Sequence, residues 1–221
     1  MPIERIAHRG AKRELPENTI PAFRRAFERG ADAIELDVHA TSDGVVVVHH
    51  DPGVRRGVRM VEIAETLIDG LGTLDGGGPA RLADVLAMVP ANRTVYAEIK
   101  GHGIERLVAD CVAAAPQTVR CAVHSFDHGA IEVMRDIAPN IPRGVLFEND
   151  TAGILDVMAR TGARDVWPNW KLVDASLVHA VHDAGGRVIV WTVNDVDVAR
   201  RLSEIGVDGL CGDDVRLFSD S

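Results

Sequence analysis

The first 51 residues of this chain carry histidines and carboxylates in a spacing suited to cleaving a phosphodiester. His8 opens a His-Arg-Gly triplet, Glu35 and Asp37 flank a single leucine, and His50 directly precedes Asp51. Such cleavage needs one group to take a proton from the attacking oxygen and another to give one to the leaving oxygen, and histidine can do either near neutrality. A lone histidine at a strand end is more often structural, but two beside several carboxylates favour an acid/base pair.

Three acidic residues are the candidate metal ligands. Glu35 and Asp37 lie two residues apart on a predicted strand, so both side chains point to the same side of it, and Glu98 and Lys100 repeat this spacing. Carboxylates this close together are costly to bury unless they are protonated or bridged by a cation. Three carboxylates without clustered cysteines favour one hard divalent ion, Mg²⁺ or Ca²⁺, over zinc. Ordinary ion pairs with Arg and Lys are the alternative.

Four further residues are candidates for contacts with a substrate. Arg9 and Lys100 can neutralise the nonbridging oxygens of a phosphate, Arg9 through its planar fork. Asn18 either turns the loop into the following helix or directs its amide at the site. Trp191 either lines an apolar edge of the pocket or belongs to the core. Both alternatives stay open for Asn18 and for Trp191.

Short β-type runs alternate with helical runs along the chain, and this alternation predicts the fold. The predicted strands span residues 3–8, 33–38, 94–99, 120–125, 143–147, 165–168, 187–192 and 209–211. The predicted helices span residues 17–29, 81–88, 105–114, 130–137, 154–160, 175–184 and 196–205, with a short eighth around 214–218. This order indicates an α/β fold, a (β/α)8 TIM barrel. A β-type run at 45–50, behind a turn sequence, predicts a small extension after the second strand.

The barrel prediction brings the candidate residues together. Active sites of such barrels form at the carboxyl ends of the strands. The predicted strands end at or near His8, Asp37, Glu98 and Trp191. These side chains therefore converge on one mouth, which scattered surface charges would not do. Because side chains alternate along a strand, at most one of the neighbours His49 and His50 enters the site. The other histidines, His124 among them, have no comparable context.

Composition and charge limit the class of protein. With 221 residues, 46% of them hydrophobic, the chain can bury a large core as a single domain over residues 1–221. Its formal net charge of -9 argues against nucleic acid as a partner and against a polybasic membrane contact. The three distant cysteines are interpreted as reduced thiols. Since the chain has neither a long apolar run nor a signal-peptide core, we expect a cytoplasmic protein without stable membrane insertion.

The motifs, taken together and in order, resemble the signature of the glycerophosphodiester phosphodiesterase family. The matching elements are His-Arg-Gly at 8–10, Pro-Glu-Asn-Thr at 16–19, Glu-Leu-Asp-Val at 35–38 and His-Asp at 50–51, with weaker matches at 98–100, 125–127, 191–194 and 206–209. The resemblance implies an enzyme that uses a divalent metal to cleave small glycerophosphodiesters into sn-glycerol 3-phosphate and an alcohol. It implies an acid/base pair of His8 and His50, metal ligands Glu35, Asp37 and Glu98, and phosphate contacts from Arg9 and Lys100.

Two departures from the family pattern leave the substrate preference open. Residues 212–215 read Gly-Asp-Asp-Val where the family usually has Thr-Asp, an aromatic residue and proline, and Gly57 and Val58 follow Arg56 where threonines are common. A lysophospholipase D-like or phosphoinositide-type phosphodiesterase on the same fold is the alternative function, and an open apolar groove near the three tryptophans would favour it. A barrel that only binds its ligand is a third alternative, which the intact set of candidate residues argues against. The oligomeric state stays open.

Overall fold

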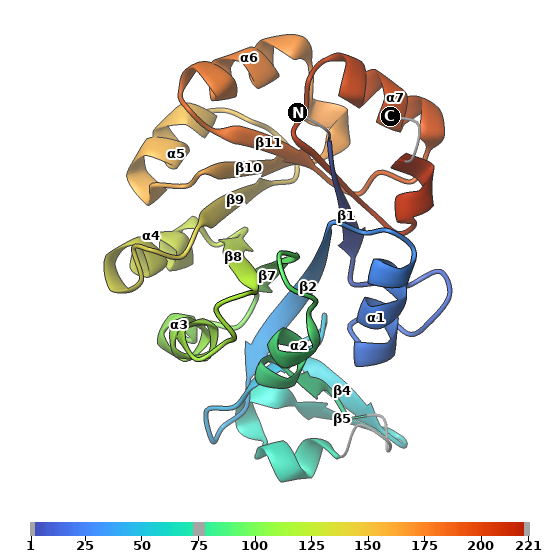
Figure 1. Cartoon of the computed structure of the whole chain (residues 1–221). Helices are drawn as coiled ribbons and strands as arrows, with labels where there is room; N and C mark the ends of the chain where they lie inside the picture. The colour runs from blue at the N-terminus through green and yellow to red at the C-terminus, as the bar shows by residue number, and fades with distance from the viewer. Residues whose placement is uncertain (1–2, 73–77, 219–221) are drawn as a thin grey trace.

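The computed structural model describes residues 3–72 and 78–218, and its centre is a closed barrel of parallel strands (Figure 1). The barrel strands are β1 (Glu4–His8), β2 (Ala33–Ala40), β7 (Thr94–Ile99), β8 (Arg120–Ser125), β9 (Arg143–Phe147), β10 (Asp165–Pro168), β11 (Arg187–Val190) and β12 (Gly209–Gly212). Each pairs in parallel with its neighbours, and β1 pairs with both β2 and β12, which closes the ring. The predicted (β/α)8 barrel is confirmed.

Helices connect the strands and cover the outside of the barrel (Figure 1). They are α1 (Ile20–Glu28), α2 (Leu82–Met88), α3 (Glu105–Ala113), α4 (His128–Ile137), α5 (Ile154–Thr161), α6 (Ala175–Asp183) and α7 (Val196–Glu204). Short 3-10 helices are η1 (Ile63–Glu65), η2 (Ile68–Leu71), η4 (Trp170–Leu172) and η5 (Val215–Phe218). The last of these takes the place of an eighth helix, as the sequence predicts. No helix in residues 3–72 or 78–218 is long and apolar enough to cross a membrane.

The alternation of side chains along β2 shows how the barrel separates its core from its site. Ile34, Leu36 and Val38 belong to the main apolar core, which also includes residues of the surrounding helices. The intervening Glu35 and Asp37 point to the other side, into the barrel. Lower in the barrel the interior is filled by a second apolar cluster of Ile6, Ala33, Tyr96, Ala122, Leu146, Trp167, Ile189 and Cys211. Polar inward residues therefore lie above an apolar floor.

Helix α1 begins three residues later than predicted, and the loop before it explains why. Asn18 has a φ of 57°, a left-handed conformation that ends any helical run through it. Thr19 then caps the helix, because its side chain accepts a hydrogen bond from the backbone N–H of Ala22. At the other end Gly30, with a φ of 88°, terminates the helix as expected of a glycine after the last turn.

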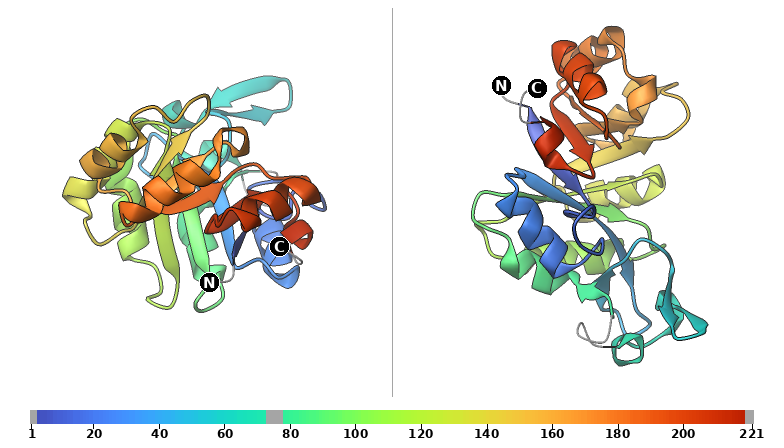
Figure 2. Two further views of the ribbon diagram at one scale, coloured as in Figure 1. Left: turned by 90° about the horizontal axis from the view of Figure 1, so that it is seen from above. Right: turned by 90° about the vertical axis from the view of Figure 1, so that its right-hand side faces the viewer.

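The predicted extension after β2 is present and larger than the sequence indicated. Strand β3 (Val46–Val48) pairs antiparallel with β2, and β6 (Ala80–Arg81) pairs with β3. Between them β4 (Gly53–Arg56) and β5 (Arg59–Glu62) form a separate two-stranded hairpin. Figure 2 shows this hairpin projecting away from the ring of helices. Strand β3 therefore runs beside the carboxyl-terminal end of β2, and His49 and His50 directly follow β3 at the rim.

Candidate active site

The residues predicted from the sequence converge on one pocket at the carboxyl ends of the barrel strands. The pocket has a volume of about 310 Å³ and a mixed lining of charged, histidine and aromatic side chains. Its lining residues are His8, Arg9, Glu35, His50, Glu98, Lys100, His124, Phe126, Leu146, Glu148, Trp167, Trp191 and Cys211. Of the nine predicted site residues only Asn18 and Asp37 are missing from this lining, and both are buried against it.

A larger cavity, of about 1030 Å³, lies at the opposite end of the barrel. Most of its charged groups are paired with one another or with close neighbours. Arg187 lies 2.5 Å from Glu4, Arg164 lies 2.5 Å from Asp165, and His182 of α6 contacts Asp208 at 2.8 Å. Since barrel enzymes place their chemistry at the carboxyl ends of the strands, we assign the active site to the smaller pocket.

Three carboxylates form the centre of the site. Glu35, Asp37 and Glu98 each offer an oxygen, and these oxygens all lie within 4.8 Å of one another. The register of β2 and β7 explains the approach, because Asp37 pairs with Glu98 across the two strands. Their exposed fractions are 3%, 0% and 8%. A cation with metal–oxygen distances of about 2.0–2.6 Å fits between oxygens at this separation.

Burial makes this cluster resist ionisation in the absence of a cation. Burial raises the pKa of Glu35 well above its usual value, and the charges of Asp37 and Glu98 raise it further. Burial also raises the pKa of Glu98 to about 7; Lys100 opposes this shift and Asp37 adds to it. A divalent cation would supply the missing positive charge, so the residues present fit a metal ion.

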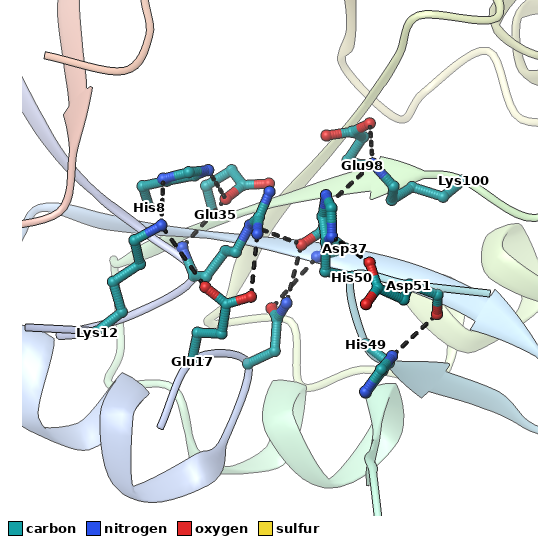
Figure 3. A network of polar contacts seen from close by, with 12 residues as sticks. His8, Lys12, Glu17, Glu35, Asp37, His49, His50, Asp51, Glu98 and Lys100 are labelled. Carbon is teal, nitrogen blue, oxygen red and sulfur yellow. Dashed lines mark hydrogen bonds and ion pairs between the residues drawn. The ribbon is translucent and has the colours of Figure 1, made fainter. Parts of the chain in front are cut away.

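Two basic side chains partly neutralise the cluster, and Figure 3 shows one of them, Lys100, beside Glu98 and Asp37. The Nζ atom of Lys100 lies 3.2 Å from Glu98 Oε1 and 3.6 Å from Asp37 Oδ1. Arg9 Nε lies 3.0 Å from Asp37 Oδ2, at ion-pair distance but without the alignment of a hydrogen bond. Arg9 also donates a hydrogen bond of 3.0 Å from Nη1 to Glu17. Both predicted phosphate-contacting residues therefore lie directly beside the carboxylates.

The amide of Asn18 points at the site. Its Nδ2 donates a hydrogen bond of 2.8 Å to Asp37 Oδ2, and its Oδ1 accepts one of 3.4 Å from the Asp37 backbone N–H. Its own backbone N–H donates to the Arg9 carbonyl at 3.0 Å. Asn18 thus both shapes the loop and fixes the orientation of Asp37, so the two roles left open by the sequence are combined in one residue.

His8 is held from behind by a carboxylate that comes from the far end of the chain. Its Nδ1 lies 2.8 Å from Asp213 Oδ1, while Nε2 is 4.0 Å from Glu35 Oε2. Asn194 donates a hydrogen bond of 2.8 Å to the other Asp213 oxygen, and Lys12 lies 3.2 Å from Oδ1. Burial alone would raise the pKa of Asp213, but the hydrogen bond and charge of His8 and the charge of Lys12 lower it to about 2. An ionised Asp213 accepts a hydrogen bond from the Nδ1–H group of His8, so Nε2 is the ring nitrogen that faces the site.

His50 has a matching arrangement at the same rim. Its Nδ1 lies 2.8 Å from Asp51 Oδ1, and its backbone carbonyl is 3.2 Å from His39 Nε2. His49 bonds instead to the Asp51 carbonyl at 2.9 Å and is directed away from the carboxylates (Figure 3). His50 lines the pocket and His49 does not. This placement agrees with the prediction that only one of the two neighbours enters the site.

His124, which the sequence interpretation set aside, also lies in the site. It is 2% exposed, neither ring nitrogen has a hydrogen-bond partner, and Nε2 is 3.9 Å from Glu35 Oε1. Its ring packs at 62° to the ring of Trp167, with centroids 4.3 Å apart. Burial lowers the pKa of His124 to about 3, so its imidazole is neutral at physiological pH. The pocket therefore has a neutral polar group in its floor.

Trp191 occupies the wall facing the carboxylates. Its Nε1 donates a hydrogen bond of 2.9 Å to the Trp167 carbonyl, which fixes the indole, and its ring meets Phe126 edge-on with centroids 5.5 Å apart. It packs against the interior apolar cluster and also lines the pocket, so both sequence interpretations apply. The sequence pattern did not indicate a site role for Asp213, His124, Phe126 or Glu148, although each lies at or just after the end of a barrel strand.

Comparison with known proteins places this geometry in a family. The sequence model of the glycerophosphoryl diester phosphodiesterase family matches residues 8–217. A glycerophosphodiester phosphodiesterase of Caldanaerobacter subterraneus subsp. tengcongensis is 30% identical and aligns with 95% of this chain and 93% of its own length. The glycerophosphodiester phosphodiesterase of Bacillus altitudinis is 31% identical, covering 94% of this chain and 93% of its own.

Solved structures agree with these sequence relatives. A crystal structure of a glycerophosphodiester phosphodiesterase from Agrobacterium tumefaciens is 26% identical, with a TM-score of 0.81 over 98% of this chain and 97% of that one. An Oleispira antarctica phosphodiesterase, solved in complex with the product sn-glycerol-3-phosphate, is 21% identical, with a TM-score of 0.85 over 98% and 95%, and shares the fold. The chain therefore belongs to the glycerophosphoryl diester phosphodiesterase family and is an enzyme of that class.

Proposed function

We propose that the enzyme hydrolyses glycerophosphodiesters to sn-glycerol 3-phosphate and an alcohol, with a divalent metal and with His8 and His50 as the acid/base pair. One observation carries this proposal: two histidines, each with Nδ1 beside a carboxylate oxygen at 2.8 Å, share a pocket with a cluster of three carboxylates. A histidine that donates its Nδ1 proton in this way presents Nε2 for proton transfer. We treat residues 1–221 as one functional domain.

Glu35, Asp37 and Glu98 are the residues that would hold the metal, Mg²⁺ or Ca²⁺. The three oxygen ligands suit a hard cation, and Cys211, although it lines the pocket, is not one of the grouped ligands. When bound, such an ion supplies positive charge beside the phosphate and lowers the pKa of an attacking hydroxyl. Arg9 and Lys100, which already lie next to these carboxylates, are suited to contact the nonbridging phosphate oxygens.

The two histidines would complete the proton balance. One takes the proton of the attacking oxygen as that oxygen forms its bond to phosphorus. The bond from phosphorus to the alcohol oxygen breaks, and the other histidine gives its proton to that oxygen. Asp213 and Asp51 keep the two rings oriented and stabilise the protonated state of each. Where water supplies the attacking oxygen, the phosphomonoester forms in this same step. Where the neighbouring hydroxyl of the glycerol supplies it, a cyclic phosphate forms, and water then opens it to the phosphomonoester.

Product release from a small panel of glycerophosphodiesters tests this proposal. The purified protein should release sn-glycerol 3-phosphate, a chelator should abolish the release, and added Mg²⁺ or Ca²⁺ should restore it. Full activity in chelator would contradict the metal assignment, and release of a different phosphorylated product would contradict the reaction. The lysophospholipase D-like alternative called for a groove near three tryptophans. Trp167 is only 1% exposed and Trp170 lies outside the pocket lining, so no such groove forms in the described part of the chain.

A further inference from the structure

One side of the pocket carries side chains that the proposed reaction does not use. Around the barrel, β1, β2 and β7 are consecutive and supply His8, Glu35 and Glu98. Phe126 follows β8, which pairs with β7, while Glu148 follows β9 and Trp191 follows β11, which lie farther round the ring. These last three side chains line the same pocket. They form a wall of two aromatic rings and one carboxylate, which we call the aromatic wall.

The two rings of the aromatic wall contact each other; Phe126 is exposed and Trp191 is half-buried. Phe126 is 41% exposed, a large fraction for a phenylalanine at the mouth of a pocket. Its ring lies at 83° to that of Trp191, whose indole is fixed by the hydrogen bond to Trp167. The negative face of a fixed aromatic ring attracts a cation, and tryptophan does so best. The wall is therefore ready to receive a positively charged group.

Glu148 is out of place in a pocket that takes only an anion. Its side chain is exposed, and within residues 3–72 and 78–218 it has no hydrogen bond or ion pair. Glu35 and Glu98, by contrast, contact the Arg9 backbone N–H and the Lys100 ammonium. The negative charge of a phosphodiester is repelled by a free carboxylate unless the substrate carries a cation of its own. An unpaired Glu148 beside two rings thus indicates a cationic substrate group.

We propose that the aromatic wall binds the ammonium of an amino-alcohol head group, so that the enzyme prefers choline and ethanolamine diesters of glycerol phosphate over diesters of neutral alcohols. This inference rests on the proposed function and deepens it. In this arrangement the phosphate lies at the carboxylate cluster. The ammonium, which is two carbons from the ester oxygen of the head group, extends to the aromatic wall. Glu148 balances the ammonium charge while Phe126 and Trp191 contact its methyl or methylene groups.

The test compares kcat/KM for glycerophosphocholine and glycerophosphoethanolamine with kcat/KM for glycerophosphoglycerol and glycerophosphoinositol. Wild type should favour the two cationic diesters. Glu148→Gln should lower the ratio of cationic to neutral kcat/KM by about fivefold, mainly through KM, because the contact is made before and during reaction. Phe126→Leu should lower the same ratio by roughly three- to tenfold. Asp156→Asn on α5, which removes an exposed charge outside the pocket, is the matched control and should leave the ratio unchanged.

The outcomes separate this inference from the proposed function. If wild type cleaves none of the four diesters, the proposed function fails. If it cleaves all four without favouring the cationic pair, or if Glu148→Gln leaves the ratio unchanged, the aromatic wall does not bind ammonium and the proposed function stands. A preference for choline alone, with ethanolamine treated like glycerol, would show that the rings select methyl groups but that Glu148 does not act through charge.

Discussion

Without a cation in the carboxylate cluster, the free energy of unfolding of this enzyme should depend on pH. The burial of Glu98 sets the direction of that dependence. Glu98 has a pKa raised to about 7 by burial, against an ordinary value of 4.5. Between these two values the folded state binds more protons than the unfolded state. The free energy of unfolding therefore falls as pH rises from about 4.5 to 7, and it levels off above that.

The size of the effect follows from the shift. A difference of about 2.5 pKa units at about 1.36 kcal/mol each gives at most about 3 kcal/mol. For a chain of this length that corresponds to a loss of about 6–12 °C in Tm at most. Glu35, whose pKa burial also raises, acts in the same direction. A metal at 100 times its Kd should restore about 2.7 kcal/mol at pH 8 and much less at pH 5, where protons compete for the carboxylates.

Thermal melts from pH 5 to 8.5 in chelator, and again with Mg²⁺ or Ca²⁺, measure this. In chelator Glu98→Gln should melt near wild type at pH 5 and above it at pH 8, because the amide replaces an anion that is costly to bury. Glu204→Gln, which removes an exposed carboxylate at the end of α7, is the control and should follow wild type throughout. Parallel curves for wild type and Glu98→Gln, or no effect of metal at pH 8, would refute the reasoning.

Three kinetic predictions follow from the same pocket. His8→Ala and His50→Ala should each lower kcat by roughly 10²–10⁴-fold in steady-state assays, and His49→Ala far less; the reverse order for the neighbouring pair would show that the wrong ring had been assigned. Asp213→Asn should lower kcat by roughly 10–10⁴-fold with little change in KM, because Asp213 orients His8 without touching the substrate. An effect on KM alone would contradict this role. A diester without the hydroxyl next to its esterified carbon should bind but react slowly if that hydroxyl attacks phosphorus, whereas equal rates would establish direct attack by water.

Local sequence patterns were sufficient for much of the fold. Strands such as β7 and β9 have the bounds that their runs of β-branched and apolar residues predict. Errors concentrate at the ends. The predicted strand 187–192 stops at Val190, and α1 starts late because Asn18 adopts a left-handed conformation that no propensity scale assigns to a particular asparagine. At these positions tertiary contacts, and not local sequence preference, determine the backbone conformation.

The site was predictable where spacing within one strand carried the information. Glu35 and Asp37 share a side because they are two residues apart, and the barrel then brings Glu98 beside them. Asp213 was missed because its partner, His8, is 205 residues away in the chain, and only ring closure between β1 and β12 makes them neighbours. For His124 the signal was present, since it is a polar residue at the end of a strand, as Glu98 is.

The arrangement of the barrel interior explains why the cluster needs a cation and why the fold tolerates it. Below the site, inward residues such as Tyr96 and Ile189 fill the barrel, so water cannot reach the carboxylates from that side. Above it, Lys100 and Arg9 provide only partial neutralisation, because they are two cations beside three carboxylates and Arg9 is also shared with Glu17. The burial that raises the pKa of Glu98 is thus produced by the same packing that closes the barrel. The free-energy cost of holding three acids together therefore comes from the packing of the barrel. The same exclusion of water strengthens the electrostatic interactions of a cation and a phosphate that enter the pocket, because water screens their charges poorly there.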